Sequence, residues 1–211
     1  MALEQQLIHG LEALRWEWVA TALALIFLLL ALGRQRGCWL FAALSAAVSF
    51  GIHWRQNSTL SLLLNGAYLL IVAYGWWRWR RPSIDVVPGR LCGAARVYLV
   101  ATALAMTLVA GFWADHYALA RAPYAEAFIV SSALGFLGLL AYQYIECWYC
   151  LLLSEAVSVT LALQAGAQTS ASLHCWYMAL AMVGIGLWVN VIRALPGDSA
   201  AQGDRRGLVR Q

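Results

Sequence analysis

The stretch Leu62–Trp79, LLLNGAYLLIVAYGWWRW, decides the fold of this 211-residue chain. It is apolar for most of its length, contains an amide at Asn65, and ends in aromatic residues and arginine. A helix needs about 20 mostly apolar residues to cross the hydrocarbon core of a bilayer, and tryptophan gathers at the two interfaces. The stretch therefore predicts a transmembrane helix that carries a polar group inside it.

The composition of the whole chain favours a membrane protein. Hydrophobic residues make up 63% of the sequence and charged residues 11%, whereas a soluble domain carries roughly 25% charged residues. So little charge cannot cover a globular surface, so the chain needs a bilayer as its solvent. We predict an all-α membrane fold with seven spans: Trp16–Leu32, Cys38–Trp54, Ser58–Trp79, Ala94–Trp113, Tyr124–Tyr144, Cys147–Gln164 and Ser172–Ala194.

The two ends of the chain lie outside these spans. In residues 1–15, leucines recur at helical spacing between glutamate and glutamine, which predicts an amphipathic helix in the membrane interface. Residues 195–211 are predicted to form a tail. The chain has no lysine, and 11 of its 14 basic residues fall on one set of loops. The positive-inside rule then places the N-terminus outside and the C-terminus in the cytoplasm. This topology signal explains the net charge of +4 without a nucleic-acid partner.

The sequence also matches itself after a shift of 109 positions. Cys38-Trp39 then aligns with Cys147-Trp148. Three residues of the opening stretch also align with identical residues: Tyr68 with Tyr177, Gly75 with Gly184 and Trp79 with Trp188. Chance matches of tryptophan, tyrosine, cysteine and glycine in one register are rare, so we infer a duplicated three-helix unit.

This duplication predicts the order of the domains. The first repeat covers residues 16–79, a loop and linker helix cover 80–124, and the second repeat covers 125–194. A unit of three spans ends on the opposite side of the membrane from where it began, so a second copy joined directly to it would be inverted. One linker helix between the copies gives the second copy the same direction as the first, which makes the repeats parallel. Parallel repeats are typical of transporters, with the substrate near the midplane.

The repeat gives the polar residues a predicted role. Asn65 and Tyr68 lie on one helical face, and His174 and Tyr177 lie on the matching face of the second repeat. Polar groups in the hydrocarbon normally face the bundle interior. Asn and His can hydrogen-bond an uncharged polar ligand, and the aromatic rings can stack on it. Alternatively, Asn65 and His174 only tie helices together.

Several of these residues carry a resemblance to the PnuC family of bacterial vitamin transporters. Tyr68, Tyr74, Gly75, Trp76 and Trp79 match its third-helix pattern, with Asn65 in the place of a usual glutamine. At the sixth span, Glu146 and Trp148 match the family's Glu-Asn-Trp segment, with Cys147 in the place of asparagine. Glu155 occupies the position of the polar residue that follows this segment in the family. The chain departs from the family in the fifth span, where Gly135 and Phe136 occupy the neighbourhood of a common glutamine.

The resemblance implies a seven-helix fold in a 3+1+3 arrangement related to the SWEET sugar transporters, assembled as a homotrimer in the bacterial inner membrane. It implies a transporter rather than an enzyme, without a cofactor. The expected substrate is nicotinamide riboside, carried by facilitated diffusion and trapped by phosphorylation in the cytoplasm. Thiamine or a related vitamin is the alternative substrate.

Further residues complete the predicted substrate site. Glu155 lies near the middle of its span, where a carboxylate costs on the order of 2.5–3.5 kcal/mol, so it should face a cavity or a partner such as His174. We favour a hydrogen-bonding role for it over proton coupling, because no second embedded acid accompanies it. Glu126, near the outer end of the fifth span, is a predicted entrance residue that can contact substrate. Trp39 and Trp148 are predicted to bind substrate as well.

An alternative of another class uses the Cys147-x-x-Cys150 pair as a membrane thiol oxidoreductase. The arginine distribution opposes it, since it places these thiols on the cytoplasmic side, where dithiols stay reduced. The four histidines are too scattered along the chain to predict a metal site.

Overall fold

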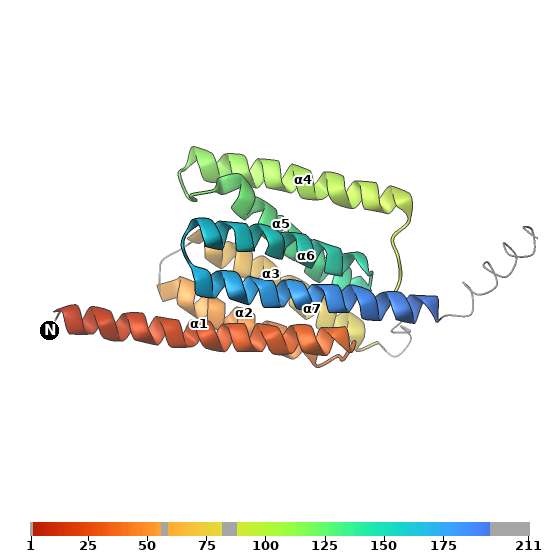
Figure 1. Ribbon diagram of the computed structural model, residues 1–211, viewed down its shortest axis with the longest axis horizontal. Helices are drawn as coiled ribbons and strands as arrows, with labels where there is room; N and C mark the ends of the chain where they lie inside the picture. The colour runs from red at the N-terminus through yellow and green to blue at the C-terminus, as the bar shows by residue number, and fades with distance from the viewer. Residues whose placement is uncertain (1, 56–58, 82–87, 195–211) are drawn as a thin grey trace, which may run out of the picture. The chain divides into compact units, whose positions relative to one another are not determined.

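The structure is a computed structural model that describes residues 2–55, 59–81 and 88–194. These residues form seven α-helices (Figure 1). The helices are α1 (Ala2–Leu32), α2 (Cys38–Arg55), α3 (Thr59–Trp79), α4 (Gly93–His116), α5 (Pro123–Tyr142), α6 (Glu146–Gln164) and α7 (Gln168–Arg193).

Each predicted span falls on one of these helices, which confirms an all-α membrane fold. Among the residues searched, α4, α5, α6 and α7 are both long and apolar enough to cross a bilayer. The start of α7 differs most among the later helices, because the structure begins it at Gln168 rather than at the predicted Ser172.

The N-terminal segment differs more. Where the sequence predicts an interfacial helix over residues 1–15 followed by a separate span, the structure has one unbroken helix, α1 (Figure 1). Residues 2–32 include no proline, the residue that most strongly breaks a helix, so the backbone continues through the change in polarity. The position of residues 1–15 in the interface stays a prediction.

The chain divides into two compact units, residues 1–84 and 85–211. In the first unit, α2 packs against both α1 and α3. Its core centres on Trp39 of α2, whose side chain is buried among Phe27 of α1 and Trp79 of α3. The rings of Trp39 and Trp79 meet edge to face, with centroids 5.5 Å apart and planes at 88°. Gly75 lies directly under the Trp39 ring, which leaves no room there for a Cβ atom.

The second unit contains the same arrangement around Trp148 of α6. The ring of Phe136 on α5 lies 5.9 Å from that of Trp148, and Trp188 on α7 meets it edge to face at 5.6 Å and 87°. Gly184 again leaves no room for a Cβ atom under the indole. Each unit therefore has a core built around a buried tryptophan, and the two core tryptophans are 109 positions apart in the sequence.

The turns that precede the two core tryptophans also match. Arg34 after α1 and Gln143 after α5 both adopt left-handed backbone, with φ of 54° and 61°. In the first turn, the N–H groups of Arg34 and Gln35 donate to the carbonyls of Ala31 and Leu30 at 3.0 and 2.9 Å. The second turn repeats these two bonds at 2.9 and 3.0 Å, 109 positions later. This pattern is the Schellman motif that ends many helices.

Helix α4 presents an apolar surface. It packs against α5, where Gly111 accommodates the ring of Tyr124. Most of its large apolar side chains are exposed: Val97, Tyr98, Val100, Leu104, Met106, Leu108, Val109, Phe112 and Trp113. A surface of this kind is stable against lipid tails or another apolar partner, as expected in a membrane protein.

Candidate functional site

The two core tryptophans each contain a polar atom that lacks a partner. Trp39 and Trp148 are 1% and 0% exposed, and their indole Nε1 atoms are buried with no hydrogen-bond partner among the described residues. An indole nitrogen can only donate, and leaving a buried donor unpaired costs roughly 1–3 kcal/mol. Two such donors at positions related by the 109-residue shift are candidates for hydrogen bonds to a ligand.

An interhelical pair lies further along the second unit. Glu155 of α6 and His174 of α7 are joined by a 2.6 Å hydrogen bond between Oε2 and Nδ1. Their side chains are 14% and 26% exposed, so both are largely withdrawn from the surface. The ring of Tyr177, one turn along α7, meets the imidazole edge to face with centroids 6.3 Å apart. The predicted partnership of Glu155 with His174 is thus confirmed.

The indole of Trp148 and the pair of Glu155 and His174 lie on the same packed surface of α6 and α7. These two helices run antiparallel, since Trp148 meets Gly184 and Trp188 near the end of α7 while Glu155 meets its start. Glu155 lies seven positions after Trp148 in α6, which corresponds to about 10 Å along the helix. The rings of Phe136, Trp148 and Trp188 form the tryptophan cage of the second unit, as those of Phe27, Trp39 and Trp79 do in the first. In the second unit, the indole of Trp148 therefore lies two turns of α6 from the polar pair, on one interface.

The first unit carries the corresponding face on α3. Asn65 and Tyr68 lie on successive turns, and both side chains are partly exposed. The position that corresponds to Glu155 is Ala46 of α2, a buried residue. Both units thus have a tryptophan cage. They differ in ionisable groups, because Ala46 and Asn65 of the first unit stand where the second unit has Glu155 and His174.

The other predicted residues have separate surroundings. Glu126 is exposed in the first turn of α5, where its Oε1 accepts a 3.4 Å hydrogen bond from the Ala122 N–H. Near the end of α3, the guanidinium of Arg80 lies 5.7 Å from the Trp76 ring. Tyr74 contacts Trp77, with ring centroids 5.9 Å apart. These contacts agree with a capping role for Glu126 and an anchoring role for the aromatic end of α3.

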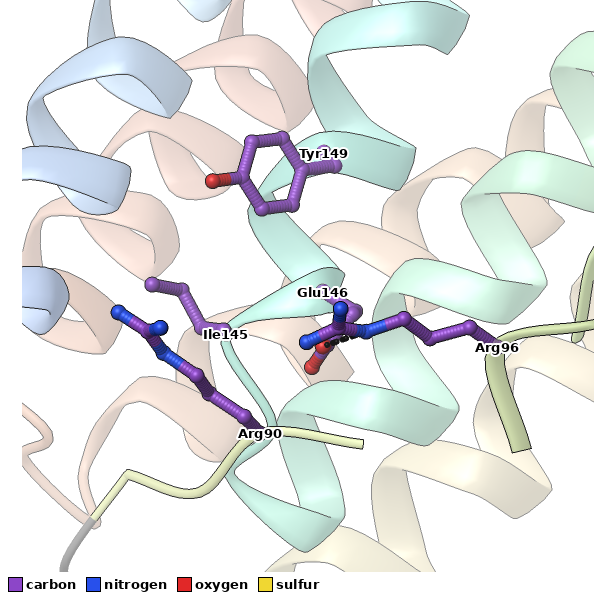
Figure 2. A pocket seen from close by; sticks show the side chains of 5 residues that line it. All are labelled: Arg90, Arg96, Ile145, Glu146 and Tyr149. Carbon is purple, nitrogen blue, oxygen red and sulfur yellow. Dashed lines mark hydrogen bonds and ion pairs between the residues drawn. The ribbon is translucent and has the colours of Figure 1, made fainter. Parts of the chain in front are cut away.

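Glu146 has more contacts than the sequence indicates. Its carboxylate accepts bonds of 3.1 and 3.2 Å from the Leu91 N–H. It also accepts a 2.9 Å bond from Arg96 Nε (Figure 2). A pocket of about 380 Å³ lies beside it, lined by Arg90, Arg96, Ile145, Glu146 and Tyr149. Backbone bonds of Gly89 with Gln143 and Ile145 reinforce this junction. Glu146 therefore ties the segment before α4 to the turn between α5 and α6.

The thiol oxidoreductase alternative depends on the surroundings of the cysteines. All five are free thiols, and Cys147 is fully buried at the start of α6. Cys150 packs toward Gly135 of α5, with its sulfur 3.7 Å from the place of a Cβ atom. No group of three or more metal-ligating side chains occurs within the described parts of the chain.

Comparison with known proteins gives a consistent picture. The family model described as "Nicotinamide mononucleotide transporter" matches residues 14–190. The riboflavin/roseoflavin transporter RibM of Streptomyces davaonensis is 26% identical over 178 residues, covering 82% of this chain and 83% of RibM. The crystal structure of the vitamin B3 transporter PnuC superposes with a TM-score of 0.67 at 16% identity, covering 84% of this chain and 82% of that one. At that identity, the likeness to PnuC shows a shared fold.

Proposed function

The chain belongs to the nicotinamide mononucleotide transporter family, the family of PnuC, and we propose that it carries nicotinamide riboside across the bacterial inner membrane. It is a vitamin transporter of this family, and the riboside is the specific substrate that we assign to it. Transport is facilitated diffusion, and net uptake follows when the riboside is phosphorylated in the cytoplasm. A phosphate adds about −1.5 to −2 charges, which prevents the product from returning through the bilayer or the same site.

The observation that carries this assignment is the pair of unpaired indole donors at Trp39 and Trp148. The riboside has hydroxyl and carboxamide oxygens that accept hydrogen bonds, and its flat ring can stack on aromatic side chains. A ligand that accepts a hydrogen bond from either donor would recover the free energy lost by burying that donor. The proposed substrate-binding residues are Trp39, Asn65, Tyr68, Glu126, Trp148, Glu155, His174 and Tyr177.

The proposed architecture is two parallel three-helix repeats joined by α4, as in the SWEET transporters. The matching tryptophan cages and the matching helix-ending turns, each 109 residues apart, support this duplication. The assembly is a homotrimer, with the N-terminus outside and the C-terminus in the cytoplasm. The apolar surface of α4 offers a face for lipid or a neighbouring subunit.

The test compares two tryptophans of the same cage. Trp148→Phe keeps an aromatic ring but removes the unpaired donor, whereas Trp188→Phe makes the same change at a ring that is equally buried. Both variants leave a gap that lowers the unfolding temperature, but Trp148→Phe also removes an unpaired buried donor and should therefore lower it less than Trp188→Phe. Only Trp148→Phe should also weaken riboside binding, by about five- to a hundredfold, if a hydrogen bond of roughly 1–3 kcal/mol is lost. Calorimetry on detergent-purified, monodisperse protein gives both values, and equal affinities for the two variants would contradict the assignment.

A flavin is the second candidate substrate, because the similarity to the riboflavin/roseoflavin transporter RibM covers 82% of the chain. Thiamine is a third candidate from the family resemblance. Titrating riboflavin and thiamine into the same preparation separates the candidates directly.

A further inference from the structure

A charged pocket lies where the segment before α4 meets the start of α6 (Figure 2). Its volume is about 380 Å³, and two arginines, Glu146, Ile145 and Tyr149 line it. None of these lining residues belongs to the set that we propose for substrate binding. Glu146 is 7% exposed and bonds both Leu91 and Arg96, so the wall of the pocket is fixed. A fixed, charged pocket outside the proposed substrate site needs a ligand of its own.

The pocket has more positive charge than its own side chains neutralise. Arg96 donates from Nε to Glu146 at 2.9 Å, and the four N–H groups on its terminal nitrogens make no bond within the described part of the chain. Arg90 is exposed and has no hydrogen bond or ion pair with any residue that the structure describes. Two arginines and one glutamate leave a net charge of +1. The site therefore lacks one negative charge.

The pocket lies at the level of the membrane interface. Helix α6 has 19 residues and is roughly 28 Å long, which is close to the 30 Å thickness of the hydrocarbon core. Its first turn, which contains Glu146 and Tyr149, therefore reaches the lipid headgroups. Arg96 lies in the first turn of α4, and the predicted orientation places this end of the helix in the cytoplasm. The cytoplasmic leaflet contains anionic lipids.

Exposed apolar side chains continue from the pocket along two helices. On α4, Val100 and Leu104 follow Arg96 at intervals of four residues, so they lie on the same helical face, and both are exposed. On α6, the exposed Leu153 follows Tyr149 by the same interval. Both helices begin at the pocket and pack on α5. These faces therefore lead from the arginines toward the interior of the bilayer.

We propose that this pocket binds the phosphodiester of an anionic phospholipid. Arg90 and the terminal nitrogens of Arg96 donate hydrogen bonds to the phosphate oxygens, for which arginine is well suited. The acyl chains lie along the exposed apolar side chains of α4 and α6. A phosphodiester has one negative charge, which matches the +1 of the site. A phosphate monoester has about −1.5 to −2 charges, which would leave excess negative charge beside the Glu146 carboxylate.

The experiment measures lipid binding to the detergent-purified, delipidated protein by native mass spectrometry. Phosphatidylglycerol and phosphatidylcholine with the same chains are titrated, because the second lipid is zwitterionic. The parent should bind phosphatidylglycerol at least about fivefold more tightly, since each arginine near a headgroup contributes about 1 kcal/mol, a factor of about five.

Arg90→Gln should weaken phosphatidylglycerol binding about fivefold and leave phosphatidylcholine binding unchanged. Arg193→Gln removes the same charge at an exposed position in the last turn of α7, outside the pocket, and should behave like the parent. An equal loss in the two variants would show general attraction between charges and would overturn the site. Because Arg90 is exposed, its replacement should leave the unfolding temperature of the lipid-free protein unchanged.

Two further probes identify the source of the phosphate. Glycerophosphoglycerol has the same headgroup without acyl chains, and inorganic phosphate has neither. Both should bind at least about tenfold more weakly than the lipid, because they bury no methylene groups. Binding of either as tightly as phosphatidylglycerol would overturn a lipid as the ligand, and equal affinities of the parent for the two lipids would overturn the proposal. The two-lipid comparison on the parent decides the question even if Arg90→Gln does not fold.

Discussion

The indole ring of Trp148 lies directly against the backbone of Gly184, with no space for a Cβ atom between α6 and α7. The same relationship joins Trp39 to Gly75 in the first unit. Small residues of this kind let helices in a membrane approach closely. Each glycine therefore sets the distance at which its helix packs on the core tryptophan.

Gly184→Ala should destabilise the protein by about 1–3 kcal/mol, because the added methyl group overpacks a buried ring. Gly186, two residues along α7, has open space where its Cβ would lie. Gly186→Ala should therefore be neutral or stabilising by up to about 1 kcal/mol, as alanine favours the helix. Thermal unfolding in detergent measures both. Equal unfolding temperatures for the two variants would show that the close contact is absent.

Glu146→Ala should destabilise the junction between α4 and α6 by about 1–3 kcal/mol, because it leaves the Leu91 N–H and the Arg96 guanidinium without their acceptor. Arg96→Ala should cost less, since the guanidinium is half exposed and the carboxylate keeps its bonds from Leu91. Arg90→Ala, in the same pocket, serves as the control. Thermal stability in detergent should decrease most for Glu146→Ala, and the opposite ranking of the two partners would contradict this role.

Replacing both thiols of the Cys147-x-x-Cys150 segment by alanine should leave vitamin uptake largely intact. Cys147 is fully buried and both cysteines are free thiols, which fits packing rather than exchange chemistry. Uptake into proteoliposomes with and without reductant is the measurement. A stable, inserted double variant that has lost all transport would favour the oxidoreductase alternative instead.

A topology reporter tests the predicted orientation. Alkaline phosphatase is active only outside the cytoplasm, because its disulfides form there. Fused after Gln211, it should be inactive, since the arginine distribution places that end in the cytoplasm. An active reporter at that end would overturn either the orientation or the number of spans.

Hydrophobicity predicts most of this fold, because each span must bury its backbone polar groups in a helix within the bilayer. The interaction of Glu155 with His174 could be predicted for a related reason, since an embedded carboxylate requires a partner. The length of α1 could not be predicted in the same way. A change from amphipathic to apolar sequence marks a change of environment, whereas the helix itself continues wherever no residue breaks it.

Other features depend on side-chain packing, which a sequence pattern does not contain. The pattern identifies Gly75 and Trp79 on one face of α3, but the ring of Trp39 that they enclose comes from another helix. Glu146 and Leu91 are 55 residues apart, and no periodic signal connects them. The unpaired state of the two indole donors likewise depends on the whole surrounding core.

Uptake of labelled nicotinamide riboside into proteoliposomes tests the central claim most directly. Purified protein should equilibrate the riboside across the membrane, and vesicles loaded with a riboside kinase and ATP should accumulate the phosphorylated product. Excess unlabelled riboside should compete, and Trp148→Phe should require a higher riboside concentration for half-maximal uptake than Trp188→Phe. Uptake of riboflavin or thiamine without uptake of the riboside, at the same protein content, would contradict the assigned substrate.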